Sequence, residues 1–329
     1  MAKRVKLADI AREAGVSVTA ASFYINGKAE QYKLSKATCE RLEAAVRKYD
    51  FVPNLFARAM QQNRTFLVGL LVRDRINSSF WSDIIAGIED GLSASGCHLV
   101  LASTHTDPEQ ELEALRQMRA KGVDGYVISP VLDDEGKIPN LEHLWKLNEN
   151  RPVVGLNLVL DGIASVYNDD AAGGALAARF LWENGHRNVA LLGNPFGFGQ
   201  PRFRAFEEFY GAHGLVPQRF FDPGEVLAAA GSFTAVFCLH DLLAAALCSN
   251  ATAAGMRIPE AFSVIGYDGL AWLKLLEPAP STVYQHKYDL GQAVAAQLLL
   301  AFETGRCESV RFEPILVPGG TVGPAAATL

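Results

Sequence analysis

Two kinds of hydrophobic pattern divide the chain, and they meet near residue 65. Before that point, apolar residues recur every three or four positions, which is typical of short amphipathic helices. After it, short apolar runs alternate with helical stretches, which indicates parallel sheets covered by helices on both faces. The runs are FLVGLLV, HLVLAS, GYVISP, PVVGLN, NVALLGN, AVFCLHD and FSVIGYD. The sequence therefore predicts a small all-α head followed by a larger α/β body.

Three helices are predicted in the head. The apolar positions of the first two are Leu7, Ile10 and Ala14, and then Val18, Ala21 and either Tyr24 or Ile25. Gly15 falls where the chain must turn between these helices, and Ser17 is placed to cap the second. A third helix is expected over about residues 35–49, with an apolar stripe formed by Cys39, Leu42, Ala45, Val46 and Tyr49. This pattern favours a helix-turn-helix DNA-binding domain, and a plain three-helix cap on the body is the alternative.

Length and composition restrict the class of protein. The 329 residues suffice for two or three domains, and 49% of them are apolar, as in globular proteins. The five cysteines are scattered, with no spacing that indicates a disulfide framework or a metal site. The charged N-terminus MAKRVKLADI is followed by no apolar stretch of signal-peptide type, and no run reaches membrane-spanning length. A cytoplasmic protein without metal, cofactor or membrane partner is expected.

The charge is spread unevenly. The whole chain has a formal net charge of −6. Residues 1–62 carry eleven Lys and Arg against six Asp and Glu, so this segment is +5 and the remainder is −11. A basic head on an acidic body is the distribution expected when only the head binds a polyanion. A chance cluster on a solvated face is the alternative interpretation.

Several motifs in the head resemble those of the lactose/galactose repressor (LacI/GalR) family of bacterial transcription regulators. The matching residues are Asp9-Ile10-Ala11, Ala14-Gly15-Val16-Ser17, Tyr24-Ile25-Asn26, Phe51, Pro53, Asn54, Ala57 and Met60. The likeness continues through GIEDGL, GVDGYVI, ENGHRNVALLG, IPEAFSVIGYDG and PSTVYQH, so it spans nearly the whole chain. The loop at residues 26–35 is similar to that of the fructose- and sucrose-type regulators.

The resemblance implies a division into domains. It places a helix-turn-helix domain at residues 1–50, a hinge helix or linker at 51–64, and an effector-binding and dimerisation domain at 65–329. This last domain has the fold of periplasmic binding proteins, with two parallel-sheet subdomains. Their expected bounds are approximately 65–160 plus 291–320, and 161–290.

The resemblance also implies which head residues contact DNA. The base-reading positions correspond to Val18, Thr19 and Phe23. Phe23 departs from the family, which often has Arg there, and a place in the head's core is the other interpretation. The phosphate-contacting candidates are Ser17, Ser22, Asn26, Lys28, Lys33, Ser35, Lys36 and Thr38.

A hinge helix is expected directly after the head. Its DNA-contacting candidates are Asn54, Ala57 and Met60, with Met60 at the family's position for an apolar wedge in the minor groove. Pro53 suits the first turn of such a helix. A helix this short is marginal alone and is expected to form only on DNA or in a tight dimer, and an ordinary linker is the alternative.

Effector-binding candidates follow the predicted strands, because ligands of open α/β sheets bind beyond the carboxyl ends of strands. Carried over from the family, they are Asp74, Arg75, Asn77, Phe80, Trp81, Asn157, Arg202, His240, Asp268 and Gln285. Amides, carboxylates and an arginine beside aromatic rings suit a sugar or sugar phosphate. Alternatively, Arg202 and Asp268 form a structural ion pair and Phe80 or Trp81 belongs to the core. His240 replaces the usual Asn and introduces a group expected to titrate near neutral pH.

The predicted function is transcriptional regulation, as a homodimer on a palindromic double-stranded operator under the control of a small-molecule effector. A periplasmic-type binding protein without a DNA role is one alternative, and it would require a signal peptide. An α/β enzyme is a weaker one, since GNPFGFGQ at residues 193–200 is neither a dinucleotide-binding nor a Walker A motif. No heptad extension of the kind that ties some relatives into tetramers follows the last predicted strand. Whether the effector releases or promotes DNA binding stays open.

Overall fold

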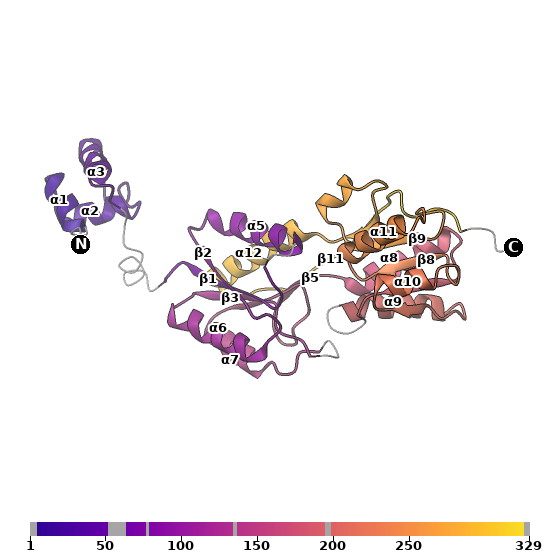
Figure 1. Cartoon of the computed structure of the whole chain (residues 1–329). Coiled ribbons are helices and arrows are strands. Elements are labelled where there is room, and N and C mark those ends of the chain that lie inside the picture. The colour runs from indigo at the N-terminus through magenta and orange to yellow at the C-terminus, as the bar shows by residue number, and fades with distance from the viewer. Residues whose placement is uncertain (1–4, 52–63, 77–78, 134–136, 195–198, 326–329) are drawn as a thin grey trace. The chain divides into compact units, whose positions relative to one another are not determined.

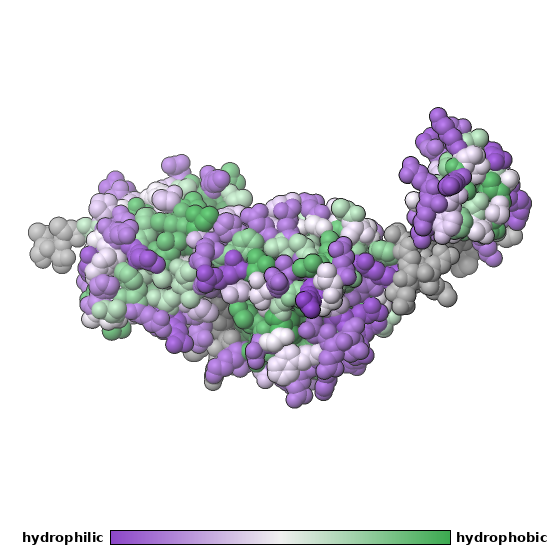
Figure 2. Space-filling view, turned by 180° about the vertical axis from the view of Figure 1, so that it is seen from behind, coloured by the Kyte–Doolittle hydropathy of each residue, from purple (hydrophilic) through white to green (hydrophobic). Residues whose placement is uncertain are grey.

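A computed structural model describes residues 5–51, 64–76, 79–133, 137–194 and 199–325. The chain separates into two compact units, Met1–Phe66 and Leu67–Leu329, which we call the head and the body and describe separately (Figure 1). On the face shown in Figure 2, polar residues cover much of each unit and apolar areas interrupt them.

Three helices form the part of the head that the structure describes, as the apolar periodicity predicts. They are α1 (Leu7–Glu13), α2 (Val18–Ile25) and α3 (Lys36–Lys48). The expected cap of the second helix is confirmed, because the Ser17 hydroxyl accepts a hydrogen bond from the Ala20 amide at 3.1 Å. Gly15 lies in the turn with a φ of 64°, a conformation that favours glycine.

The core of the head is small and contains mostly the predicted residues. Its fully buried members are Ile10, Ala11, Ala14, Ala21, Leu42 and Ala45. Three expected members lie outside this cluster: Val18 is 49% exposed at the start of α2, Tyr49 is 37% exposed beyond α3, and Cys39 near the start of α3 is half-buried. The Tyr49 hydroxyl instead donates to the Glu13 carboxylate at 2.9 Å. The helical period alone does not reveal that the ends of α2 and α3 extend past the small core.

The predicted hinge or linker spans residues 51–64. Residues 52–63, which make up most of it, lie outside the described residues. Asn54, Ala57 and Met60 are among them.

The body contains two six-stranded sheets. The first has the order β11-β5-β4-β3-β1-β2, with all strands parallel. Its strands are β1 (Leu67–Val72), β2 (His98–Ser103), β3 (Gly125–Ile128), β4 (Val153–Leu156), β5 (Ser165–Asn168) and β11 (Val310–Phe312). The helices that pack on it are α5 (Ser79–Ser93), α6 (Pro108–Ala120), α7 (Glu142–Asn148) and α12 (Lys287–Thr304). Figure 1 shows α5 and α12 on one face of this sheet and α6 and α7 on the other.

The second sheet has the order β12-β10-β9-β8-β6-β7, and only β12 runs antiparallel to its neighbour. Its strands are β6 (Val189–Leu192), β7 (Gln218–Phe220), β8 (Ala235–Cys238), β9 (Ser263–Asp268), β10 (Ser281–Tyr284) and β12 (Ile315–Val317). The accompanying helices are α8 (Asp170–Glu183), α9 (Gln200–Gly211), α10 (Pro223–Ala228), α11 (Asp241–Ala253) and the 3₁₀ helix η2 (Ala271–Leu275).

Side chains of the second sheet alternate between two buried clusters. Val189 and Leu191 of β6 pack with α8 and α9, whereas Ala190 and Leu192 pack with α10 and α11. Burial on both faces explains why the strand sequences read as continuous apolar runs. All seven predicted runs contain a strand, which confirms the predicted α/β fold of the body.

The chain crosses between the sheets three times, between β5 and α8, between β10 and α12, and between β11 and β12. The observed subdomain boundaries therefore differ from the expected ones. Strand β5 follows residue 160 but pairs in the first sheet, α12 begins at Lys287 rather than at 291, and β12 before residue 320 pairs in the second sheet. These boundaries depend on strand pairing, which apolar periodicity does not encode.

One glycine lets two helices of the second subdomain approach closely. A Cβ on Gly174 of α8 would lie 2.0 Å from the carbonyl oxygen of Arg202 in α9. A real side chain cannot occupy that space, so the close contact between α8 and α9 requires glycine. This contact also fixes the backbone from which the Arg202 side chain extends.

We predict that Gly174→Ala lowers the free energy of unfolding by about 3 kcal/mol, because the added methyl group must separate α8 from α9. Urea denaturation of both proteins measures the change. Gly211→Ala is the matched control: it lies in the last turn of α9 with nothing within 4 Å of the added Cβ. The control should shift the free energy of unfolding by less than about 1 kcal/mol. Equal effects of the two substitutions would contradict the packing argument.

Candidate functional site

The exposed side of α2 forms a hollow in the head. It has a volume of about 390 Å³ and is lined by Leu7, Val18, Thr19, Ser22, Phe23, Asn26 and Lys28. Six of these seven were predicted DNA contacts, and the structure brings them together along α2 and just past its end. The Asn26 amide donates to the Ser22 carbonyl at 2.8 Å, which holds the end of α2 in place.

Phe23 packs against the loop that follows α2. Its ring stacks on that of Tyr32 with the centroids 3.6 Å apart and the planes within 1°. Tyr32 is 47% exposed, and the buried cluster of the described head residues does not include Phe23. The partner of Phe23 is thus an exposed aromatic residue supplied by the loop at 26–35. Sequence reasoning did not single out Tyr32, because nothing local connects it to α2.

The remaining DNA candidates lie on that loop and at the start of α3. Ser35 caps α3 through its hydroxyl, which accepts from the Thr38 amide at 3.2 Å. Lys33 and Lys36 are exposed on either side of this cap. A helix N-terminus flanked by lysines suits contact with phosphate oxygens.

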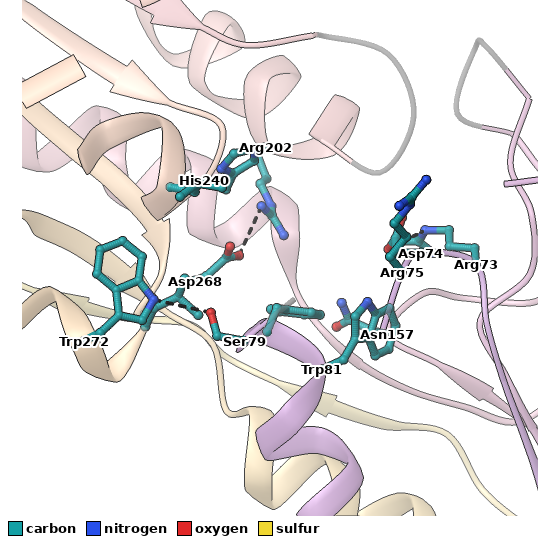
Figure 3. Close-up of a pocket in the computed structure, with 13 residues that line it drawn as sticks. Arg73, Asp74, Arg75, Ser79, Trp81, Asn157, Arg202, His240, Asp268 and Trp272 are labelled. Atoms are coloured by element: carbon teal, nitrogen blue, oxygen red, sulfur yellow. Dashed lines mark hydrogen bonds and ion pairs between the residues drawn. The ribbon is translucent and has the colours of Figure 1, made fainter. Parts of the chain in front are cut away.

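The body contains a cavity of about 570 Å³ between its two sheets (Figure 3). Its lining residues are Arg73, Asp74, Arg75, Ser79, Phe80, Trp81, Asn157, Arg202, His240, Leu242, Asp268, Leu270 and Trp272. Eight of the ten predicted effector residues are among them. Asn77 lies outside the described residues, and Gln285 is fully buried outside the lining.

Arg202 extends into the cavity from α9 and is 2% exposed. Its Nε lies 3.0 Å from an Asp170 oxygen, and its Nη1 lies 3.5 Å from an oxygen of Asp268. The guanidinium also covers the Tyr267 ring at 3.8 Å. Burial lowers the pKa of Arg202, but Asp170, Tyr267 and Asp268 outweigh it and raise the pKa above its usual value. Arg202 is therefore a permanent cation that both forms ion pairs and lines the cavity.

Asp268 occupies the carboxyl end of β9 in a strained backbone conformation, with a φ of 114°. The Gln285 amide donates to its Oδ1 at 2.8 Å, and the Lys287 ammonium donates to its carbonyl oxygen. Burial raises the pKa of Asp268 to about 6, although Arg202 and Lys287 oppose this. Gln285 therefore holds Asp268 in place from behind, which differs from its predicted place in the cavity.

His240 is the N-cap of α11. Its Nδ1 accepts a hydrogen bond from the Leu243 amide at 3.2 Å, a role that requires an unprotonated nitrogen. Burial lowers the pKa of His240 to about 4, and the neighbouring Arg202 contributes in the same direction. The expectation of titration near neutral pH is wrong, because a second cation at this position would face both Arg202 and the positive end of a helix. An Asn, usual here in the family, is also a good N-cap.

Asp241 shapes the same wall without entering the cavity. Its buried carboxylate accepts from the Thr282 hydroxyl at 2.6 Å and from the Leu270 amide at 2.8 Å. Leu270 is thereby fixed where it lines the cavity. Burial, with Asp268 close by, raises the pKa of Asp241 to about 7.

The opposite wall comes from the first sheet and α5. Trp81 is 1% exposed and meets the Phe80 ring edge to face at 5.3 Å. Asn157 follows β4 with a φ of 56°, and its Oδ1 accepts from the Asn168 amide at 3.3 Å. Trp81 is thus both a core residue and part of the lining, so the two interpretations offered for it are compatible.

Sequence reasoning missed five lining residues. They are Arg73, Ser79, Leu242, Leu270 and Trp272. Arg73 had a detectable signal, since it is a charge directly at the end of an apolar strand. Trp272 had none: its indole Nε1 donates to the Ser79 hydroxyl at 3.3 Å across the cavity, over a sequence separation of 193 residues (Figure 3).

Two further properties concern the described residues alone. They contain no group of three or more His, Cys, Asp or Glu side chains arranged to hold a metal ion. None of their helices is long and apolar enough to cross a membrane.

Comparison with known families covers both units. Residues 6–54 match "Bacterial regulatory proteins, lacI family". Residues 65–222 match "Periplasmic binding proteins and sugar binding domain of LacI family", and residues 178–322 match a periplasmic binding protein-like domain. The chain belongs to the LacI family. Its members are transcription regulators rather than enzymes, so this LacI-family chain is a DNA-binding transcriptional regulator.

Curated relatives of this LacI-family chain are repressors. The HTH-type transcriptional repressor PurR of Erwinia tasmaniensis is 29% identical, over 93% of this chain and 92% of the relative. The sucrose operon repressor of Pediococcus pentosaceus is 29% identical, over 92% and 94%.

Solved structures share the fold of this LacI-family chain. The lac repressor dimer bound to operator and an anti-inducer has a TM-score of 0.83 at 24% identity, with 97% of this chain and 99% of that chain covered. A LacI-family regulator from Enterococcus faecium with bound ribose has a TM-score of 0.68 at 26% identity, with 79% and 100% covered. The first shares the fold of the head and of the body, and the second shares the fold of the body.

The lowered pKa of His240 predicts a pH dependence of stability. Because His240 binds a proton more weakly in the folded than in the unfolded chain, its contribution is complete above pH 6.5 and is lost as the pH falls toward 4. Relative to His240→Asn, which caps α11 without titrating, the wild type should lose about 2 kcal/mol of unfolding free energy between pH 7 and pH 5. Denaturation curves of both proteins across this range measure the difference. If the unfolding free energies of the two proteins change equally with pH, His240 is not held neutral in the folded protein.

Proposed function

We propose that this chain represses transcription as a homodimer on a two-fold symmetric operator, and that a sugar or sugar phosphate bound in the body's cavity controls its DNA affinity. The observation that carries the proposal is the cavity itself. It lies between two sheets of a periplasmic-binding fold and combines charged, amide and aromatic side chains. Such a regulator acts on the chromosome, so we place it in the cytoplasm.

The surface of the head supports a role in reading DNA. Val18 and Thr19 are exposed at the start of α2, the part of a recognition helix that meets base edges in the major groove. An apolar contact from Val18 suits a thymine methyl group, and the Thr19 hydroxyl suits either a donor or an acceptor. We assign phosphate contacts to the lysines of the loop and of α3. Because each neutralised phosphate releases counterions, binding should weaken with salt.

The hinge is part of the same proposal. We infer that Asn54 and Ala57 contact the minor groove and that Met60 enters between base pairs, as the family motif implies. Two copies of Met60 would meet at the centre of a symmetric operator, which connects the hinge to dimerisation. The lac repressor, which was solved as a dimer on its operator, is a precedent for this assembly.

The chemistry of the cavity suits a polyhydroxylated ligand. Asn157 and Asp268 offer amide and carboxylate groups from opposite walls, and Trp81 adds an apolar ring on the side of Asn157. A volume of about 570 Å³ accommodates a mono- or disaccharide. Related regulators have been solved with ribose and with cellobiose.

A ligand in this position is able to control the body's conformation. It contacts residues of both subdomains, so it stabilises whichever arrangement brings both walls to it. The hydrogen bond between Trp272 and Ser79 shows that the walls are already in direct contact at one point. We infer that ligand binding and DNA binding are coupled through this closure.

Selection of DNA sequences by the full-length protein tests the DNA role. We expect a symmetric site bound at least about 1,000-fold more tightly than a scrambled duplex at physiological salt. Tyr32→Ala, which removes the ring under Phe23, should relax the choice of bases while leaving the salt dependence unchanged. Lys274→Ala, an exposed change in the body, is the control and should match the wild type. No preference for any sequence in the wild type would overturn the proposal.

A ligand screen tests the control of DNA binding. Sugars, sugar phosphates, nucleosides and amino acids are added to the full-length protein, and its melting temperature and operator affinity are recorded. We expect one of the sugar classes to raise the melting temperature and to change operator affinity at least fivefold. A nucleoside or amino acid as the only active ligand would overturn the assignment of a sugar effector.

A further inference from the structure

A large cavity on the first subdomain has no role in the function described so far. It has a volume of about 720 Å³ and lies between α6 and α7, on the face of the first sheet that these helices cover (Figure 1). Its apolar part includes the buried side chains of Leu115, Val123 and Leu147. None of the described residues that line it also lines the cavity between the sheets. We call it the outer cavity.

The two cavities lie at opposite ends of the same strands. The cavity between the sheets includes Arg73 and Asn157, which follow β1 and β4. The outer cavity instead includes Val123, which precedes β3, and Arg151, which precedes β4. Because β1, β3 and β4 are parallel, a ligand in the outer cavity would be bound away from the proposed effector.

A buried tyrosine of β3 lines the outer cavity. Tyr126 is 1% exposed. Within the part of the chain that the structure describes, its hydroxyl group has no hydrogen-bond partner. A buried tyrosine hydroxyl usually has one. The Tyr126 hydroxyl is therefore a donor available to a molecule bound in the outer cavity.

Two arginines lie close to this hydroxyl, Arg119 near the end of α6 and Arg151 before β4. Burial raises the pKa of Tyr126, and the positive charges of Arg119 and Arg151 oppose this. Among the described residues, no carboxylate contributes to the shift. Because the pKa is raised on balance, the hydroxyl keeps its proton at neutral pH and is able to donate it to an anion.

The other basic side chains of the lining are already paired with carboxylates. The pairs are Arg116 with Glu113 at 3.1 Å, Lys146 with Glu142 at 3.8 Å, and His143 with Glu111 at 2.7 Å.

Arg119 and Arg151 differ from these paired cations. Their side chains have no hydrogen bond or ion pair in the described parts of the chain. Glu149 is the one carboxylate among the described lining residues, and it is exposed. Two guanidinium groups thus remain for one hydrated carboxylate, so the outer cavity keeps a positive charge around Tyr126.

We propose that the outer cavity is a second ligand site, which binds a small organic phosphate through Arg119, Arg151 and the Tyr126 hydroxyl. A phosphate group has three terminal oxygens that accept hydrogen bonds from guanidinium and hydroxyl groups. A carboxylate offers only two oxygens to the same donors. The apolar side chains of Leu115 and Leu147 suit a hydrophobic remainder of the ligand, such as an aromatic ring.

The affinity of this site depends on its buried part. Arg119 and Arg151 are exposed, and water and salt weaken the attraction of exposed charges for an anion. The Tyr126 hydroxyl and the apolar wall are buried, where a hydrogen bond to an anion and the burial of a ring both gain strength. We therefore expect an organic phosphate to bind at physiological salt.

Calorimetric titration of the full-length protein tests the class of ligand. The probes are phenyl phosphate, inorganic phosphate, benzoate and phenol. We expect phenyl phosphate to bind about 10-fold more tightly than each of the others, because it alone combines a phosphate group with an apolar ring. Benzoate binding as tightly as phenyl phosphate would overturn the assignment of a phosphate. Failure of phenyl phosphate to bind at millimolar concentrations would overturn the site itself.

Three variants test whether the binding occurs in the outer cavity. Tyr126→Phe removes a hydroxyl without breaking a hydrogen bond of the described chain, so the melting temperature should not fall while phenyl phosphate binds about 10-fold more weakly. Arg119→Gln should weaken binding by a similar factor. Arg204→Gln, which changes an exposed arginine of α9 that pairs with Glu208, is the matched control and should bind like the wild type. Wild-type affinity in Tyr126→Phe or Arg119→Gln would overturn the inference.

Nuclear magnetic resonance of labelled tyrosines locates the bound probe directly. The chain has nine tyrosines, which are isotope-labelled at Cζ, and the signal that Tyr126→Phe lacks is that of Tyr126. Phenyl phosphate should shift this signal with the dissociation constant found by calorimetry. Shifts confined to other tyrosines would place the probe elsewhere and contradict the assignment.

These outcomes are independent of the proposed function. If phenyl phosphate does not bind while a sugar class changes operator affinity, only the second site fails. If phenyl phosphate binds as expected and no sugar class acts, the second site stands and the effector role of the cavity between the sheets fails.

Discussion

The buried ion pairs of Arg202 are the interaction on which the body depends. They join Asp170 at the start of α8 to Asp268 at the end of β9, and the Arg202 Nη1 also donates to the Leu239 carbonyl at 3.0 Å. A buried guanidinium with one carboxylate removed would leave an uncompensated charge, so these elements keep their relative positions. The close approach of α8 and α9 at Gly174 also keeps these two helices in fixed relative positions. Because this wall is rigid, a ligand that binds to it is held in one position.

Much of the fold follows from the sequence, for physical reasons. Strands buried on both faces read as apolar runs, and each predicted run contains one. Among the described residues, five strands were missed. The strands β7, β11 and β12 have three residues each and no fully buried position, and β5 and β10 (SVYN and STVY) contain polar residues, so none of the five produces an apolar run. Their pairing, and hence the subdomain boundaries, depends on contacts between distant residues. The ends of α2 and α3 were misjudged because helical period does not indicate where a small core stops.

The candidate site was partly predictable because polar residues at the ends of apolar strands share one edge of a sheet. That rule placed Asn157, His240 and Asp268 in the cavity, and it applies equally to Arg73, which the family motif left out. It fails for Gln285, because a residue just past a strand faces either the cavity or the buried residues behind the lining. Gln285 lies among the latter. The rule also says nothing about protonation. The neutral form of His240 is favoured because the residue is partly buried as the N-cap of α11 and lies near the cation of Arg202.

Trp272 and Trp81 place an indole ring on each wall of one cavity, and Trp272 is tied by its Nε1 to a hydroxyl of the opposite subdomain. Any change in the separation of the walls alters the polarity around both rings. The protein thereby contains an intrinsic optical probe of its own closure, and its emission reports that motion without an attached label.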